Sequence, residues 1–183
     1  MIRQERLIDE FFELVRTDSE TRNERAVCDL LKAKFASLGL AAEEDDTAAI
    51  TGHGAGNLIA SWPAAPGMED AAPILFTCHM DTVSPGRGIR PRVDADGYIR
   101  SDGTTILGSD DKAGVAALLE AIRVVQERNI PHGRIQFVIT AGEESGLVGS
   151  RVLDPARLDP AYGYALDSDG KIGEICTAGP SQV

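Results

Sequence analysis

The chain has 183 residues, of which 43% are hydrophobic and 26% are charged, a composition typical of a soluble globular domain with its own core. Its net charge of -11 at pH 7 argues against a nucleic-acid partner, because binding to phosphates requires clustered lysine and arginine. The sequence has neither a charged-then-apolar leader nor an apolar run as long as a membrane span. We therefore expect no membrane association and a cytoplasmic protein.

The three cysteines support that location, because they show no C-x-x-C spacing and are odd in number. A disulfide framework is therefore not expected, and a reducing compartment is favoured.

The first two expected elements are amphipathic helices. Residues Gln4–Arg16 place apolar side chains at helical spacing. A second helix is expected to begin near Thr21, because Thr21 and Glu24 have the spacing of a capping box. Gly39 provides the signal for its end.

Strands then alternate with helices along the rest of the chain. We expect strands at Asn57–Trp62, Pro73–Cys78, Ile135–Thr140, Tyr162–Leu166 and Ile172–Cys176, a hairpin around Asp96-Gly97, a helix over Ala113–Arg128 with Glu120, Arg123 and Glu127 on its solvent face, and a short helix near Ser145. This alternation predicts an α/β fold, with a mostly parallel, doubly wound sheet flanked by helices. No internal domain boundary is apparent, so residues 1–183 are treated as belonging to one domain.

Acidic or imidazole side chains follow the predicted strands or open the predicted helix at four places. These are His79 with Asp81, Asp110 with Asp111, Glu143 with Glu144, and Asp167. In an open α/β sheet, the strand ends are where sites are built. One histidine with several carboxylates and no cysteine ligand set predicts a divalent metal, zinc foremost, with manganese or cobalt as alternatives.

At two of these places, the acidic residue could have a structural role instead of a functional one. Asp81 lies two residues after His79 on an extended backbone, so it can reach the ring nitrogen that does not bind metal; the alternative is a structural pair at a strand end. Asp110 opens a helix, so it can bridge two cations or serve as an N-cap. Asp111 and Lys112 would support this turn and partly balance its charge.

The Glu143-Glu144 pair is the most specific signal. Two carboxylates directly after an apolar strand repel each other unless one binds metal and the other holds a proton. Glu144 as ligand and Glu143 as general base meet that requirement; a solvated acidic turn is the alternative. Asp167 is preferred to Asp169, because it comes first after the apolar run.

The other two histidines are not expected to be ligands. His53 and His132 are both predicted to be exposed loop residues.

In combination, these stretches resemble the zinc-dependent exopeptidases of the peptidase T-like (tripeptidase) group. The matching sequences are His79-Met-Asp-Thr-Val, Leu107-Gly-Ser-Asp-Asp-Lys-Ala-Gly, Glu143-Glu-Ser-Gly-Leu-Val-Gly-Ser and Ala165-Leu-Asp. The resemblance implies two divalent metal ions: His79 and Asp167 bind one, Glu144 binds the other, and Asp110 bridges them. It also implies that Asp81 orients His79 and that Glu143 is the general base. A cis peptide bond between Asp110 and Asp111 is implied as well.

The resemblance also implies hydrolysis of short peptides by a water activated between two metals. Asp rather than Glu at position 167 favours the aminopeptidase branch. A deacylase or carboxypeptidase of the same superfamily is the alternative, and a metal-binding protein without turnover is another.

Members of that group continue into a lid domain and return with a further histidine ligand for the second metal. Because this sequence stops at Val183, we expect an incomplete catalytic domain with a weakly held second metal and impaired activity. Neither His53 nor His132 matches the further ligand. Oligomerisation through the lid is not expected for this chain.

Overall fold

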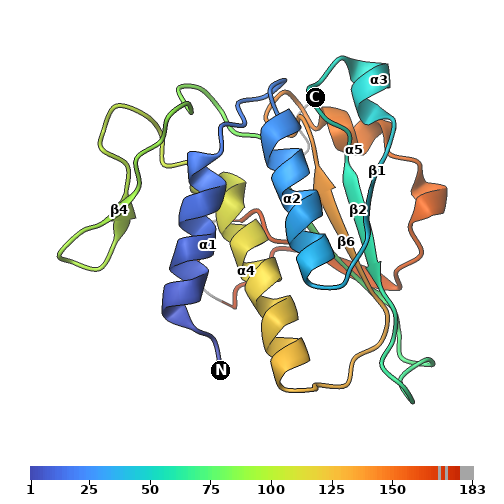
Figure 1. The fold of residues 1–183 in the computed structure, drawn as a ribbon. Helices are drawn as coiled ribbons and strands as arrows, with labels where there is room; N and C mark the ends of the chain where they lie inside the picture. The colour runs from blue at the N-terminus through green and yellow to red at the C-terminus, as the bar shows by residue number, and fades with distance from the viewer. Residues whose placement is uncertain (169, 172, 178–183) are drawn as a thin grey trace.

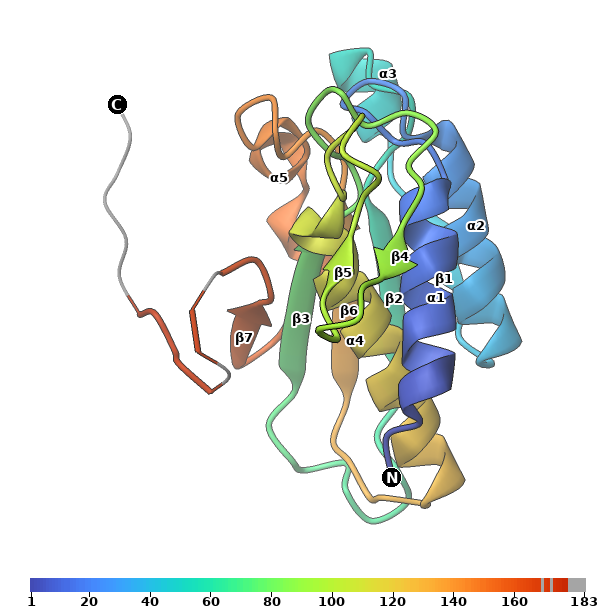
Figure 2. The same ribbon diagram turned by 90° about the vertical axis from the view of Figure 1, so that its left-hand side faces the viewer.

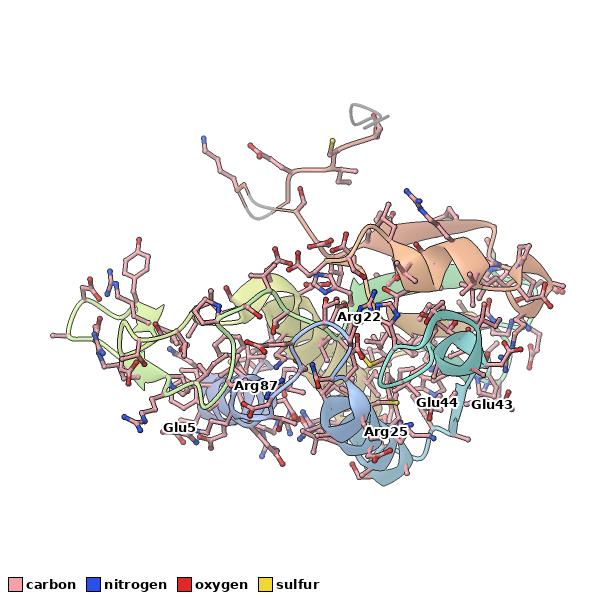
Figure 3. All side chains as sticks on the ribbon, turned by 90° about the horizontal axis from the view of Figure 1, so that it is seen from above. Glu5, Arg22, Arg25, Glu43, Glu44 and Arg87 are labelled. Carbon is pink, nitrogen blue, oxygen red and sulfur yellow. The ribbon has the colours of Figure 1, made fainter. Side chains whose placement is uncertain are left out.

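The computed structural model describes residues 1–168, 170–171 and 173–177, which form a mixed β-sheet with helices on both faces (Figures 1 and 2). The elements are α1 Gln4–Arg16, α2 Arg25–Ser37, β1 Ala42–Glu44, α3 Thr47–Thr51, β2 Leu58–Trp62, β3 Ile74–His79, β4 Arg92–Val93, β5 Ile99–Arg100, α4 Ser109–Glu127, β6 Ile135–Thr140, α5 Val148–Val152, the 3-10 helix η1 Pro155–Arg157 and β7 Tyr162–Ala165. Viewed from above in Figure 3, α1 and α2 lie on one side of the sheet and α5 lies on the other.

The five-stranded sheet has the order β1-β2-β6-β3-β7. Strand β3 pairs in parallel with β6 and β7, whereas β2 pairs antiparallel with β1 and β6. The α/β class with flanking helices is confirmed, and the sheet is mixed, with its parallel pairs concentrated on β6, β3 and β7. Helix α4 provides the long crossover that a parallel β3–β6 pair needs. The carboxyl ends of these three strands therefore meet at one edge.

The core lies between the sheet and the layer of α1, α2 and α4. The six residues of β6 are all buried, as expected for a central strand covered on both faces. On the helical side, the ring of Phe137 lies 5.9 Å from that of Phe35 and 6.3 Å from that of Phe76, measured between centroids. Leu119 and Ile122 of α4 complete this layer with less than 2% exposure.

Helix α2 begins later than predicted. It starts at Arg25, and no side chain caps it, so the capping-box prediction is wrong. The backbone turns into the left-handed region at Arg22, with φ of 75°. This turn lets the Glu24 carboxylate accept hydrogen bonds from the backbone N–H groups of Arg22 and Gly54 at 2.7 and 2.8 Å. The predicted end of the helix at Gly39, where φ is 76°, is confirmed.

The prediction that Glu120 faces solvent is also wrong. Helix α1 packs along α4 (Figure 1) and covers that side of the helix. The Glu120 side chain is 3% exposed and accepts hydrogen bonds from the Arg6 guanidinium at 2.7 and 2.8 Å and from Arg3 N at 3.0 Å. One turn further on, Arg123 forms an ion pair with buried Glu10.

Most of the remaining predicted elements are present with shifts at their ends, and the last predicted strand is wrong for the residues that the structure describes. The β4–β5 hairpin forms around Asp96-Gly97 as predicted, and the short helix expected near Ser145 begins at Val148. Of the strand predicted at Ile172–Cys176, Ile172 lies outside the described residues, and residues 173–176 are not in a strand. Within the described part of the chain, no helix has the length and apolar character needed to cross a bilayer.

Candidate metal centre

One histidine and four carboxylates meet at the edge where the parallel strands end. His79 is the last residue of β3, Asp110 opens α4, Glu143 and Glu144 follow β6, and Asp167 follows β7. From His79 Nε2, the distances are 2.9 Å to Asp110 Oδ1, 3.7 Å to Asp167 Oδ1 and 3.9 Å to Glu143 Oε2. Side chains up to 88 positions apart in sequence therefore lie close together at the carboxyl ends of the parallel strands.

The donor atoms form two overlapping groups that fit a divalent cation. His79, Asp110 and Glu144 form one group, and His79, Glu143 and Asp167 form the other. Within each group, one ligand atom from every residue lies within 4.8 Å of the others. A set of imidazole and carboxylate donors suits zinc, and it also suits manganese or cobalt. Together the two groups contain the four residues predicted as ligands, and the second group also includes Glu143, which was predicted as the general base.

The orientation of His79 points one ring nitrogen at the candidate ligands. Nδ1 lies 2.9 Å from the backbone carbonyl oxygen of Asp81, to which it donates, and 3.5 Å from Asp81 Oδ1. The predicted contact between the carboxylate and the ring is therefore present, although the carbonyl of the same residue is the nearer acceptor. Fixing Nδ1–H in this way directs Nε2 toward the carboxylates.

Asp81 also holds the loop that carries the two glutamates. Its fully buried carboxylate accepts hydrogen bonds from Glu143 N at 2.9 Å, Glu144 N at 3.2 Å and the Thr21 hydroxyl. Burial favours the neutral acid, but the hydrogen bonds from His79, Thr21 and Glu143 outweigh it and lower the pKa of Asp81. Asp81 is thus an anion that links β3 to the loop after β6.

The raised pKa values of three groups indicate that this pocket favours positive charge. Burial opposes an imidazolium at His79, but the carboxylates of Asp81 and Asp110 raise the pKa of His79 to about 10. Burial and the neighbouring Asp110 raise the pKa of Asp167 to about 6. The pKa of Glu144 is raised as well, mainly by burial. A bound cation would relieve the repulsion among these carboxylates, which is what a metal site requires.

The residues after Asp110 play structural parts. The peptide between Asp110 and Asp111 is cis, as the resemblance implied. Asp111 is buried beside Cys78, and burial raises the pKa of Asp111 to about 7. The Lys112 ammonium turns away from the pocket and donates to Thr17 O at 2.8 Å. The expectation that Lys112 balances the charge of the site is therefore wrong; it ties α4 to the end of α1.

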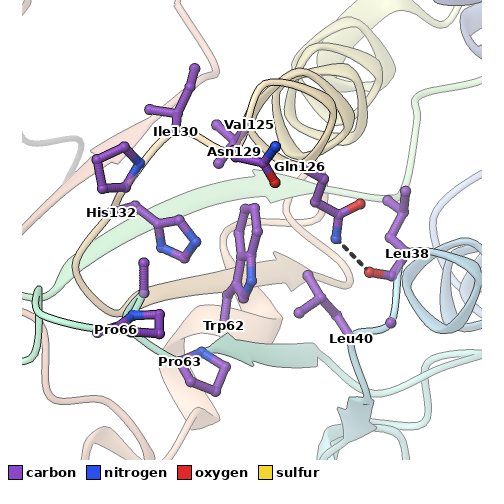
Figure 4. A pocket seen from close by; sticks show the side chains of 14 residues that line it. Leu38, Leu40, Trp62, Pro63, Pro66, Val125, Gln126, Asn129, Ile130 and His132 are labelled. Carbon is purple, nitrogen blue, oxygen red and sulfur yellow. Dashed lines mark hydrogen bonds between the residues drawn. The ribbon is translucent and has the colours of Figure 1, made fainter.

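The two other histidines are less exposed than predicted. His53 is 7% exposed, with Nε2 3.1 Å from Ser145 Oγ and Nδ1 3.0 Å from Thr51 Oγ1. His132 is half-buried, and its ring lies 4.1 Å from that of Trp62 in the hollow of Figure 4. It precedes β6, whereas Glu143 and Glu144 follow the other end of this strand. Neither joins the candidate centre as a ligand. The competing carboxylate Asp169 lies outside the described residues.

Sequence reasoning missed two contributors to this site, Thr21 and His53. Each reaches it from a loop distant in sequence, and neither belongs to a motif at the strand ends. The spacing of Thr21 and Glu24 pointed instead to a helix cap, and the glycines around His53 pointed to an exposed loop.

Comparison with known proteins shows that this chain is similar to peptidases. Residues 57–166 match the model of peptidase family M28. The chain is 56% identical over 182 residues to the uncharacterized protein YqjE of Bacillus subtilis strain 168, an alignment that covers 100% of this chain and 48% of YqjE. The chain thus spans about half the length of the curated relatives it matches.

Two solved structures are similar in both sequence and fold. The aminopeptidase PepT from Bacillus cereus ATCC 10987 superposes with a TM-score of 0.90 and 61% identity, covering 94% of this chain and 45% of PepT. A tripeptidase from Staphylococcus aureus Mu50 gives a TM-score of 0.90 and 49% identity, covering 94% of this chain and 46% of the tripeptidase. These similarities confirm the resemblance to the peptidase T-like group that the motifs indicated.

Proposed function

This chain belongs to peptidase family M28, and on that premise we propose that it forms part of the catalytic domain of a zinc-dependent aminopeptidase acting on short peptides. The observation that carries the proposal is the meeting of His79, Asp110, Glu143, Glu144 and Asp167 in one pocket. The donors come from the ends of β3, β6 and β7 and from the start of α4, and a histidine with carboxylates is a donor set suited to zinc.

The proposal gives each residue of the pocket a role. His79 and Asp167 would hold one divalent ion, Glu144 would hold a second, and Asp110 would bridge them. Asp110 suits this position because its side chain is 70% exposed and faces His79 from the mouth of the pocket. When bound, two such ions would polarise the scissile carbonyl and acidify water, as paired metals do in other hydrolases.

Glu143 is the proposed general base. Its backbone is fixed by the hydrogen bond from its N–H to Asp81, and its carboxylate is partly exposed, 3.9 Å from His79 Nε2. From that position it can take a proton from the attacking water and return it to the leaving amine. Asp81 does not reach the substrate; it keeps the His79 ring and the glutamate loop in place.

A short peptide is the proposed substrate. A cleft of about 450 Å³ adjoins Asp110 and Asp167 and is lined by residues of α4 and of the segment after β7. Its volume suits a few residues rather than a folded protein. The printed descriptions of the two similar structures, an aminopeptidase and a tripeptidase, and the aspartate at position 167 favour removal of an N-terminal residue. We further propose a cytoplasmic location, consistent with the free thiols of Cys28 and Cys78.

The test compares two classes of substrate in the complete gene product that contains this sequence. Tripeptides with a free amino terminus and N-acyl amino acids are assayed separately, each with added zinc and after chelation. Zinc-dependent release of the N-terminal residue from tripeptides alone supports the proposal. Turnover of the N-acyl compounds alone would assign the protein to the deacylases, and zinc binding without any turnover would assign it to non-catalytic metal binding.

A further inference from the structure

The loop between α1 and α2 packs against the residues that follow β3. Glu20 forms a parallel bridge with Thr82. The backbone N–H of Thr21 donates to Thr82 O at 3.0 Å, and the N–H of Thr82 donates to Ser19 O at 3.0 Å. These backbone bonds place Thr21 beside Asp81, although 60 positions separate them.

In this position, the Thr21 hydroxyl donates to Asp81 Oδ2. The other donors to the Asp81 carboxylate come from the metal centre itself: Glu143 N donates to Oδ1, Glu144 N donates to Oδ2, and His79 Nδ1 lies 3.5 Å from Oδ1. Asp81 is 0% exposed, so solvent does not reach the carboxylate to replace a lost donor. Among the described residues, Thr21 is the one whose side-chain hydroxyl donates to this carboxylate.

We propose that Thr21 is a positioning residue of the metal centre, which acts through Asp81 on His79 and on the backbone of Glu143 and Glu144. Without the hydroxyl, Oδ2 keeps only the longer bond from Glu144 N at 3.2 Å, so the Asp81 carboxylate is held less firmly against rotation about its terminal bond. Rotation weakens the bonds that Oδ1 and Oδ2 make to the glutamate loop. Groups that orient metal ligands in this indirect way typically change metal affinity by about 10- to 100-fold when they are removed.

A purely structural role for Thr21 makes a different prediction. The α1–α2 loop is held to Thr82 by backbone bonds that no side-chain substitution removes. If Thr21 served only to fix this loop, loss of its hydroxyl would leave the metal centre unchanged. The inference rests on the proposed metal-binding function. The effect of the Thr21 hydroxyl on the Glu143 and Glu144 amides, however, is measurable in metal-free protein.

The experiment compares Thr21→Val, which keeps the shape and removes the hydroxyl, with Thr21→Ser, which keeps the hydroxyl. Thr17→Val is the matched control, because the Thr17 hydroxyl bonds to Glu13 O at 2.9 Å within the end of α1. Zinc affinity is measured by competition with a chelator. Amide hydrogen exchange at Glu143 and Glu144 is measured by NMR in metal-free protein.

We expect Thr21→Val to weaken zinc binding about 10- to 100-fold and to speed exchange of both amides. We expect Thr21→Ser to restore both values, and Thr17→Val to match wild type. Wild-type zinc affinity together with wild-type exchange in Thr21→Val would overturn the inference. If Thr21→Val does not fold, Thr21→Ala, which also removes the hydroxyl without adding bulk, is measured in its place.

The two proposals fail in different ways. A wild-type protein that binds no zinc would refute the proposed function, while the amide exchange of Thr21→Val would still decide whether Thr21 positions the loop. A wild-type protein that binds zinc, with Thr21→Val unchanged in both measurements, would refute the role of Thr21 alone.

Discussion

His53 Nε2 lies 3.1 Å from Ser145 Oγ, across 92 positions of sequence. The imidazole also fills the space beside Gly142, where a Cβ atom would come within 2.6 Å of Nε2. Gly142 adopts a φ of 65° and accepts a hydrogen bond from Ser145 through its carbonyl oxygen. His53 therefore supports the turn that carries Glu143 and Glu144.

We therefore predict that His53 affects the proposed activity without being a ligand. We expect Ser145→Ala, which removes the hydrogen bonds to His53 and to Gly142 O and leaves the His53 ring in place, to lower kcat/KM for tripeptides about tenfold through misplacement of the glutamate loop. We expect His53→Ala to lower it further and to destabilise the fold by about 2 kcal/mol. His132→Ala is the control, because that ring packs on Trp62 far from the pocket. A wild-type rate in Ser145→Ala would contradict this role.

The two glutamates are expected to separate binding from chemistry. Glu143→Gln removes the proposed base but keeps a side chain of the same size, so we expect zinc affinity to change little and kcat to fall by about 10² or more. Glu144→Gln removes a proposed ligand and is expected to weaken zinc binding and activity together. Calorimetric titration with zinc and steady-state kinetics measure the two effects. Equal loss of metal and activity in both variants would contradict the division of roles.

Metal binding is expected to release protons. In metal-free protein, the carboxylates of Asp81 and Asp110 overcome burial and raise the pKa of His79 to about 10, so its imidazole carries a proton at neutral pH. A histidine must be neutral at the nitrogen that binds a metal. Rising pH removes the competing proton, so zinc affinity should increase by about tenfold per pH unit while one proton is released, and level off above about pH 10.

The proton release is measured by calorimetry in buffers with different ionisation enthalpies. Near pH 7.5, we expect about one proton per zinc. Below about pH 6, Asp167 is expected to add to the competition, because burial and Asp110 raise its pKa to about 6. Zinc affinity that stays constant between pH 6 and 8 would contradict the assignment of His79 as a ligand.

The ion pair between Arg6 and Glu120 is expected to stabilise the packing of α1 on α4. The Glu120 side chain is 3% exposed and that of Arg6 is 26% exposed. Removing one partner of a buried pair typically costs about 3 kcal/mol or more, so we expect Glu120→Ala to lower the free energy of unfolding by about that amount. Glu127→Ala is the control, because Glu127 binds the same guanidinium at 34% exposure and should cost less than about 1 kcal/mol. If urea denaturation shows that Glu120→Ala and Glu127→Ala lose the same free energy of unfolding, this prediction is wrong.

The elements that could be predicted are those that local pattern determines. Helix Gln4–Arg16 and strand Ile135–Thr140 match their predicted bounds, because helical periodicity and a continuous apolar run leave little choice of structure. The same local patterns also predict that the site residues come together in the fold. A polar residue after a buried parallel strand, such as His79 after β3, has to emerge at the edge where its neighbours end.

The features that could not be predicted depend on contacts between distant segments. Periodicity shows that Glu120 lies off the apolar face of α4, but not that α1 brings Arg6 to meet it. Thr21 looked like a helix cap because Glu24 has the right spacing, whereas the structure turns its hydroxyl to Asp81. The antiparallel pairing of β2 with β6 likewise depends on how the loops return the chain to the sheet, which short-range pattern does not record.

The central claim is that the pocket at the ends of β3, β6 and β7 binds divalent metal. A crystal of the complete gene product grown with zinc, with anomalous diffraction recorded at the zinc edge, tests it most directly. We expect two anomalous peaks about 3.5–4 Å apart, one with His79 and Asp167 among its ligands, the other with Glu144, and Asp110 between them. Zinc peaks elsewhere on the molecule, with this pocket empty at saturating zinc, would contradict the claim.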